Sequence, residues 1–330
     1  MSTTTDQVFA TPEGKFLVDP YDIWARAQDV PVLTGGAIDL LAVETRPWAR
    51  FDVKGAICHL DGRDDFLTLF VQDIAPGAAR APTRHLHEEL CYGLAGRGVA
   101  EIDLPGGGKT SVEWDPGVLF SAPMNARVRL RNTSTETARV ACVTDLRYLL
   151  SLYRNERFLF DTPMEFPARA DGDYMRDCLA APAGDMIRPN ESVLPIALAK
   201  GSIGADLVEI AANKHGRAER RMFGSLLLGV AGEGMTLSWS EEPDSPTQTR
   251  WRHGVAFAPA GMTFHQQFNV GDRAARYLSI DLGSVAAPMF RPRRRAYGDA
   301  EVYAAGSAVI ETADQDARIE AIWRAAMGET

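Results

Sequence analysis

The sequence lacks the features that would direct it to nucleic acid or into a membrane. Its 330 residues carry 44 acidic but only 35 basic side chains, for a net charge of −9, whereas phosphate contacts need a basic surface. No apolar run approaches the roughly 20 residues that cross a bilayer. We therefore expect neither nucleic acid nor a membrane as a partner.

Cysteine is also scarce. The four thiols show no CxxC spacing, so we expect them to be reduced and buried. The first residues lack the basic segment and apolar core of a secretory signal. Both observations favour a cytoplasmic protein. The sequence also lacks a G-x-S-x-G elbow and a correctly spaced phosphate loop, which sets aside two common kinds of enzyme site.

One short stretch places two histidines and a glutamate at alternate positions, His85, His87 and Glu89. On a β-strand, residues at i, i+2 and i+4 share one face, so these three side chains would converge if the stretch is a strand. Two histidines and one carboxylate form the ligand set of non-haem Fe(II) oxygenases, and Zn or Mn can use it too. The pattern predicts a divalent metal, with Fe(II) favoured over Mn or Zn.

The chain contains an internal repeat. Four residues recur 137 positions later: Trp114 as Trp251, Gly117 as Gly254, Asn132 as Asn269 and Arg139 as Arg276. The turn at residues 96–98 recurs at 232–234. Short β-like segments broken by glycine and proline run between these landmarks. They favour two tandem all-β sandwiches or barrels of about 130 residues each.

Three short helices are expected outside the β-like runs. Asp19 and Pro20 form a helix start before residues 21–29. A connecting helix is predicted over 146–156, and a last helix after Asp314 or Asp316, where apolar residues follow at helical spacing. Residues 161–192, rich in Asp, Pro, Ala and Gly, predict a linker.

These patterns resemble the cupin superfamily and, over most of residues 20–325, a bacterial two-barrel family known as cupin domain-containing proteins. The first cupin motif is matched in the first repeat by His85, His87, Glu89 and Gly96, and the second by Gly117, Pro123 and Asn132.

The first repeat also departs from the cupin pattern. A single residue separates His87 from Glu89, and Gly77 lies two residues too early. Asn125 replaces a glycine of the second motif, and Val128 occupies the position where the family carries its last metal-binding histidine.

The second repeat shows the opposite pattern. It follows the second motif with one-residue shifts, at Gly254, Pro259, Gly261, His265 and Asn269. The positions of the three first-motif ligands are taken by Arg221, Phe223 and Ser225. We therefore expect a degenerate site in the second barrel.

The resemblance implies an all-β bicupin: two tandem cupin double-stranded β-helix (jelly-roll) barrels with a few short helices. The expected boundaries are an N-terminal arm with a short helix over 1–50, the first barrel with the metal site over 51–145, a connecting helix and linker over 146–192, the degenerate second barrel over 193–290, and a C-terminal segment with a helix over 291–330. A homodimer that covers edge strands is also implied.

Three functions remain open at this point. The His85, His87 and Glu89 set favours a metal-dependent enzyme acting on a small organic molecule, with an Fe(II) oxygenase preferred, since three protein ligands plus water suffice to hold the ion. A redox-neutral isomerase or lyase could use the same metal. Val128 and the ligands missing from the second barrel favour a metal-free bicupin that binds a small molecule, in which Glu89 would pair with Arg84 or Arg97.

Five further residues are expected to line substrate pockets: His59, Cys91, Val128, Arg221 and His265. His59 lies on an early strand of the first barrel, and Cys91 shares the inward face of Glu89. In the second barrel, Arg221 and His265 could bind a small anion through charge-assisted hydrogen bonds.

Overall fold

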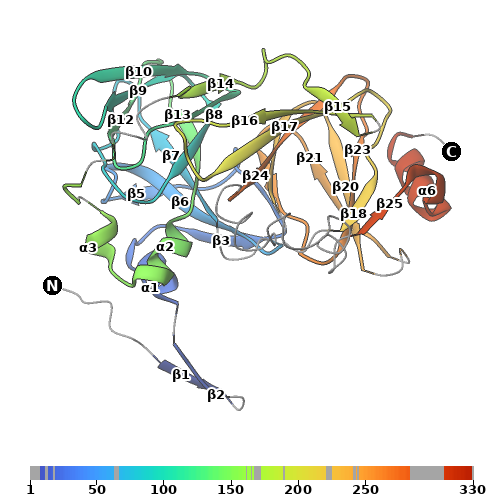
Figure 1. The fold of residues 1–330 in the computed structure, drawn as a ribbon, viewed down its shortest axis with the longest axis horizontal. Coiled ribbons are helices and arrows are strands. Elements are labelled where there is room, and N and C mark those ends of the chain that lie inside the picture. Colours follow the sequence, from blue (N-terminus) through green and yellow to red (C-terminus); the bar gives the residue numbers. More distant parts are fainter. Residues whose placement is uncertain are drawn as a thin grey trace, which may run out of the picture.

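The computed structural model describes residues 8–11, 14–17, 19–62, 67–160, 162–164, 166, 172–188, 190–220, 225–240, 243, 245–282 and 308–328. Within them the chain forms two β-barrels that lie next to each other along the long axis of the molecule (Figure 1). A hairpin of β1 (Val8–Thr11) and β2 (Gly14–Leu17) precedes the first barrel. None of the described helices is long and apolar enough to span a bilayer.

The first barrel consists of a large and a small sheet. In the large sheet the strand order is β14-β11-β8-β13-β7-β6-β3, with β5 paired to β6, and in the small sheet it is β10-β9-β12. The bounds are β3 (Val32–Gly35), β5 (Arg46–Trp48), β6 (Val53–Leu60), β7 (Thr68–Ile74), β8 (Glu89–Ala95), β9 (Gly98–Asp103), β10 (Lys109–Trp114), β11 (Val118–Ser121), β12 (Arg127–Asn132), β13 (Ala138–Thr144) and β14 (Met175–Asp177).

The second barrel repeats this plan. Its large sheet has the order β15-β16-β17-β24-β19-β22-β4, and its small sheet β21-β20-β23-β18-β25. The bounds are β4 (Ala37–Asp39), β15 (Asp185–Arg188), β16 (Glu191–Ile196), β17 (Gly204–Ile210), β18 (Ala218–Arg220), β19 (Leu226–Ala231), β20 (Gly234–Trp239), β21 (Thr247–Trp251), β22 (Val255–Phe257), β23 (Phe264–Asn269), β24 (Ala275–Asp281) and β25 (Ala308–Ile310). The described elements confirm an all-β bicupin architecture with a few short helices.

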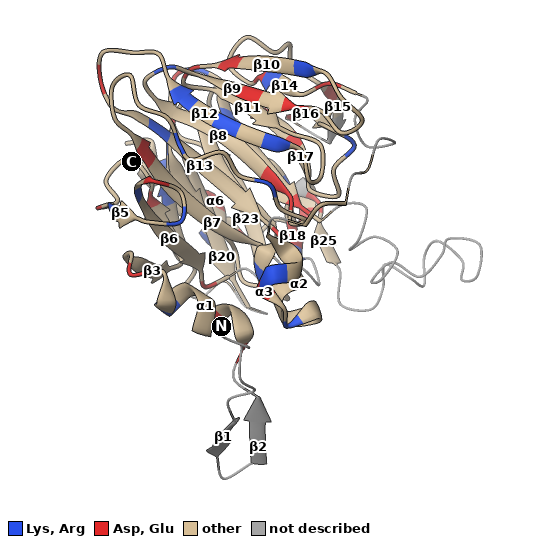
Figure 2. Ribbon diagram, turned by 90° about the vertical axis from the view of Figure 1, so that its left-hand side faces the viewer, with Lys and Arg blue, Asp and Glu red and all other residues tan. Residues whose placement is uncertain are grey.

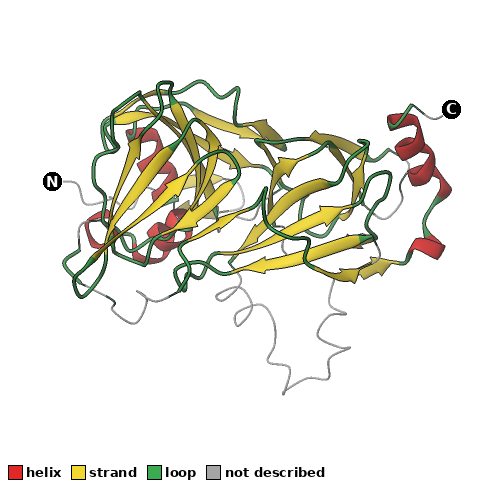
Figure 3. Ribbon diagram, turned by 90° about the horizontal axis from the view of Figure 1, so that it is seen from above, coloured by secondary structure: helices red, strands yellow, loops and turns green. Residues whose placement is uncertain are grey.

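The helices flank the barrels (Figure 3). Helix α1 (Pro20–Ala27) begins as expected, with the Asp19 side chain accepting a hydrogen bond from the Tyr21 backbone N–H at 2.9 Å. The connecting segment forms α2 (Leu146–Tyr153) and α3 (Glu156–Leu159), and a 3-10 turn (Thr312–Asp314) precedes α6 (Ala317–Ala326). Asp316 caps α6.

Flanking segments extend both large sheets beyond the boundaries expected from sequence. Strands β3 and β5, which belong to the predicted arm, pair with β6 of the first barrel, whereas β4 pairs with β22 of the second. Strand β14, in the predicted linker, joins the first barrel through β11. These strands are only 3 or 4 residues long, which is too short to show a clear alternation of apolar and polar residues in the sequence.

The sequence repeat has a direct structural cause. Trp114 lies opposite Gly98 in its hairpin, and Trp251 lies opposite Gly234. A Cβ on either glycine would overlap the facing indole. Each pair therefore places a large side chain over a residue that has none, and both members are retained in both barrels.

Two other repeated residues cross-link strands at equivalent places. The side-chain amides of Asn132 and Asn269 each donate to a backbone carbonyl group at the end of the following turn and to one at the end of a large-sheet strand (β7 or β17), at 2.7–2.9 Å. Arg139 and Arg276 each donate through Nε to a carboxylate on the neighbouring strand at 2.7 Å. Buried polar groups need such partners, so these residues recur wherever the same backbone turn does.

The two large sheets pack against each other and form the main core between the barrels. This core contains apolar residues of the first barrel such as Leu69, Leu90 and Leu119, and residues of the second such as Leu207 and Leu278. Each barrel also has its own inner core, so one side of each large sheet faces the other barrel and the other side faces a barrel interior.

The outer faces of the two small sheets differ. On the first barrel, charged side chains follow β9, β10 and β12 (Figure 2), where Arg131 pairs with Glu101 at 3.2 Å. On the second barrel, α6 covers the corresponding face and packs Ile319 and Trp323 onto it. The helical spacing of apolar residues in α6 therefore serves packing.

Candidate metal centre

The stretch that carries the three predicted ligands is bent rather than extended. His85 makes an isolated bridge to Phe160, residues 86–87 form a bend, and β8 begins only at Glu89. The imidazole rings of His85 and His87 stack with their centroids 3.6 Å apart, whereas residues two apart on a regular strand are separated by about 6.6 Å. The three side chains do converge, but the bend and not a regular strand brings them together.

His85, His87 and Glu89 are buried and can each offer one ligand atom, all within 4.8 Å of one another. His85 Nε2 lies 3.6 Å from Glu89 Oε2. Among the described residues, neither His87 Nε2 nor Glu89 Oε1 has a hydrogen-bond partner. A buried polar atom without a partner is costly unless something else binds it, so this pair fits a bound cation.

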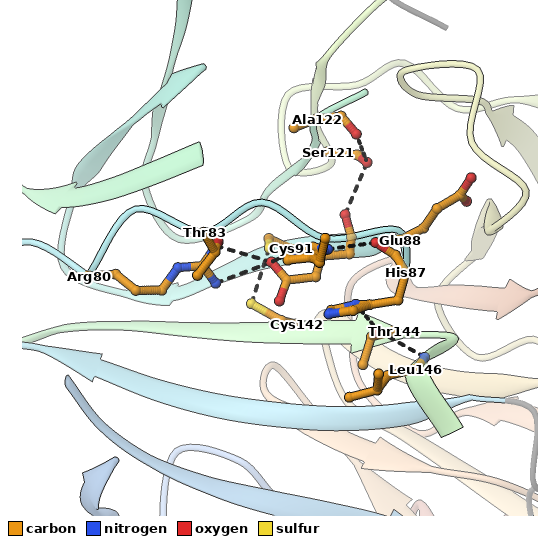
Figure 4. Close-up of polar contacts among 12 residues, drawn as sticks. Arg80, Thr83, His87, Glu88, Cys91, Ser121, Ala122, Cys142, Thr144 and Leu146 are labelled. Atoms are coloured by element: carbon orange, nitrogen blue, oxygen red, sulfur yellow. Dashed lines mark hydrogen bonds and ion pairs between the residues drawn. The ribbon is translucent and has the colours of Figure 1, made fainter. Parts of the chain in front are cut away.

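The other ring nitrogens of both histidines are held. His85 Nδ1 lies 2.7 Å from the His87 carbonyl oxygen, and His87 Nδ1 lies 2.9 Å from the Thr144 hydroxyl (Figure 4). The carbonyl can only accept, so His85 Nδ1 donates, and in the neutral form of the ring Nε2 carries the lone pair. Metal-binding histidines usually have such a partner on the second nitrogen, because it orients the ring.

The protonation states also suit a metal. Burial, with the neighbouring His85, lowers the pKa of His87 well below its usual value, so the imidazole is neutral. Burial alone would raise the pKa of Glu89, but the Arg80 guanidinium and then His85 outweigh it and hold that pKa well below its usual range. A neutral imidazole and an ionised carboxylate are the forms that bind metal.

Arg80 is the residue of this site that the sequence did not reveal. Its guanidinium is fully buried and donates to Glu89 Oε2 at 3.1 Å from both terminal nitrogens, and also to Gln72 and Thr83. The structure therefore places Arg80 beside Glu89 as its paired cation. Arg80 lies in an alanine-rich loop without any motif. The one signal that could have identified it is a single cation in an otherwise apolar stretch.

A small cavity of about 30 Å³ opens beside these atoms. Its polar lining residues are Arg80, His85, His87, Glu88, Glu89 and Asn125, and its apolar ones include Phe120, Met124, Val128 and Leu130. Such a volume holds about two water-sized groups beside a metal ion. The expected pocket residues Cys91 and Val128 both line it.

Cys91 faces Cys142 across the β8–β13 pair, with 3.1 Å between the sulfur atoms. The contact with Cys142 and burial raise the pKa of Cys91 well above its usual value. The thiol is therefore protonated and is not a nucleophile. Glu89, Cys91 and Cys142 form a second group of closely spaced ligand atoms.

The remaining predicted pocket residues lie elsewhere. His59 bonds to the Tyr21 hydroxyl at 3.2 Å, next to α1, and does not line the first cavity, because α1 covers that end of β6. His265 lines a separate pocket of about 50 Å³ in the second barrel, with its Nε2 3.8 Å from Glu219. Arg221 lies outside the described residues.

The two barrels give the chain a bicupin fold, and the first barrel contains a buried candidate metal site. Among solved structures, the chain resembles oxalate decarboxylase from Bacillus subtilis at pH 4.6, with 14% identity, a TM-score of 0.51 and coverage of 74% of this chain and 75% of that one. It also resembles the Lactobacillus farciminis oxalate decarboxylase formate complex, with 12% identity, a TM-score of 0.52 and coverage of 74% and 85%. Comparisons with protein-family models and with curated proteins give no match.

Proposed function

We propose that the first barrel is the active site of a metal-dependent cupin enzyme acting on a small organic molecule, with Fe(II) as the ion and oxygenation as the reaction. The observation that carries the proposal is the pair of buried, partnerless ligand atoms, His87 Nε2 and Glu89 Oε1, beside His85. Two histidines and a carboxylate with open positions are characteristic of Fe(II) oxygenase sites.

The residues have separate tasks. His85, His87 and Glu89 would hold the ion, which supplies Lewis acidity and an open coordination position when bound. Arg80 fixes one oxygen of Glu89 and leaves the other facing the cavity. Val128 and Leu130 make the opposite wall apolar and so limit the access of water.

The charges of the site favour an anionic substrate. Glu89 is one negative charge, whereas Arg80 and a divalent ion would together contribute three positive charges in a buried cavity. Such an excess is expensive unless an anion joins it. The small cavity and this charge suggest a short carboxylate, which also favours a second candidate reaction, the redox-neutral cleavage of a carboxylate, as the names of the structural relatives suggest.

The first experiment is elemental analysis of untagged protein, for wild type, His87→Ala and His265→Ala. We expect near-stoichiometric metal in wild type and in His265→Ala, and its loss in His87→Ala, because His265 belongs to the other barrel. A wild-type protein without metal even after anaerobic Fe(II) loading would refute the metalloenzyme and leave the metal-free binding protein. Light scattering on the same preparation tests the predicted homodimer.

Oxalate, supplied to the Fe(II)-loaded and Mn(II)-loaded protein under air and under argon, is the first substrate probe. Oxygen consumption that depends on the carboxylate would support the oxygenase. Release of carbon dioxide under argon would instead support the redox-neutral lyase. His87→Ala serves as the inactive control in both gases.

A further inference from the structure

Glu88 lies between two of the candidate ligands but faces the other way. Its side chain points away from His87 (Figure 4) and toward the second repeat of the chain. There Glu88 Oε2 accepts three hydrogen bonds, from the Ser202 backbone N–H at 2.5 Å, the Ser202 hydroxyl at 2.8 Å and the Ile203 backbone N–H at 3.1 Å. Glu88 is only 6% exposed. A buried carboxylate with three donors is firmly held.

The loop that supplies these donors has a special backbone. Ala199 and Lys200 both adopt left-handed conformations, with φ values of 52° and 49°, which L-residues other than glycine rarely adopt. A Cβ on the next residue, Gly201, would lie 3.0 Å from the Glu88 carboxylate. This turn directs consecutive N–H groups at Glu88, an arrangement that suits an anion.

The segment that Glu88 anchors needs support, because it is the bend that carries the ligands. Residues 86–88 precede the regular pairing of β8 and are attached by individual bonds: Leu86 N–H donates to the Leu159 carbonyl at 2.8 Å, and Glu88 N–H donates to Asp145 Oδ1 at 2.8 Å. The Glu88 side chain adds the attachment to the second repeat.

We propose that Glu88 is a positioning residue through which the second barrel holds the metal-binding bend of the first. Because Glu88 is the residue between His87 and Glu89, fixing its side chain on the second barrel restrains the backbone that carries both of them. The degenerate barrel thus contributes to the site of its neighbour without supplying a ligand. This inference rests on the metal site of the proposed function.

The test compares Glu88→Gln and Ser202→Ala with the matched control Glu101→Gln, a glutamate of the same barrel with a half-exposed ion pair. Co(II) affinity is measured by competition with a chelator, and the ligand field by visible absorption. We expect Glu88→Gln to weaken Co(II) binding about 10–100-fold, as changes to residues that orient metal ligands do. Ser202→Ala should weaken it less, and Glu101→Gln should leave it unchanged.

A second readout needs no metal. Amide hydrogen exchange at residues 85–89 of the metal-free protein should become faster in Glu88→Gln and stay unchanged in Glu101→Gln. Wild-type Co(II) affinity and spectrum in both Glu88→Gln and Ser202→Ala would overturn the inference, even if thermal stability fell, since the contact would then only dock the barrels. Unchanged exchange at residues 85–89 would overturn it too. A wild-type protein that binds no metal refutes the proposed function itself, while the exchange experiment still decides whether Glu88 holds the bend.

Discussion

The two barrels share one backbone register but carry different polar side chains in their interiors. Val128 pairs with Ile102 in the first barrel, and His265 pairs with Ser238 in the second. These positions are equivalent in the repeat, so the histidine that the first barrel lacks is present in the second. The first barrel keeps the ligands of the first motif, and the second keeps only the last ligand. Among the described residues, both groups of three potential ligand atoms belong to the first barrel.

The charges inside the barrels differ at a second equivalent position. The backbone N–H of Arg80 donates to the Leu130 carbonyl, and that of Gly216 donates to the Gln267 carbonyl at the matching place. A side chain on Gly216 would overlap the carboxylate of Glu191. Beside the position equivalent to the buried Arg80, the second barrel therefore has the buried carboxylate of Glu191. The comparison shows that the fold fixes where side chains meet, while individual substitutions decide which chemistry occurs there.

The largest expected effect comes from removing the buried cation of the first barrel. Arg80→Met leaves the Glu89 carboxylate buried without its cation, which should lower the free energy of unfolding of the metal-free protein by about 3–5 kcal/mol. Urea unfolding with and without Mn(II) measures this change in the free energy of unfolding. A bound divalent ion should restore part of the loss, because it replaces the missing positive charge.

The matched control is Arg252→Met in the second barrel, whose side chain is 56% exposed and forms a 2.6 Å ion pair with Asp39. It should change the free energy of unfolding by less than about 1 kcal/mol. Equal effects of the two substitutions would contradict the electrostatic difference between the barrels.

Placing a histidine at position 128 should strengthen metal binding in the first barrel. Val128 lines the same cavity as the three candidate ligands, so Val128→His would offer a fourth ligand atom. We expect Co(II) affinity to rise about tenfold, equivalent to about 1.4 kcal/mol, with a change in the visible spectrum. His265→Val, the reverse exchange in the second barrel, should leave metal binding unchanged. An unchanged spectrum in Val128→His would mean that position 128 does not reach the ion.

A smaller difference should appear in the pH dependence of the metal-free protein. The pKa of His87 is lowered in the folded state, chiefly by burial. As the pH falls, the unfolded chain therefore takes up a proton at this residue at a higher pH than the folded protein does. Neutral, buried His87 therefore contributes to the free energy of unfolding above the unfolded pKa of about 6.5. This contribution is lost as the pH falls below about 6.5. Between pH 7.5 and 5.5 wild type should lose about 1.4 kcal/mol more stability than His87→Gln. Identical pH profiles for the two proteins would show that His87 is not buried as a neutral imidazole.

Local patterns in the sequence determined the fold and the choice of candidate ligands. The spacing of His85, His87 and Glu89 identified the three groups, and the recurrence of Trp114 and Asn132 as Trp251 and Asn269 identified two barrels. These signals survive in a linear sequence because each arises from residues that are close together in the chain or from a hairpin or turn that occurs twice.

The tertiary structure alone decided the partners of those ligands. Arg80 reaches Glu89 from a loop with no motif, and Glu88 meets Ser202 from 114 residues away. His59, expected in the pocket, instead contacts α1. A contact between distant segments depends on how whole sheets pack, and a single side chain in a linear sequence carries no mark of the partner that folding will bring to it.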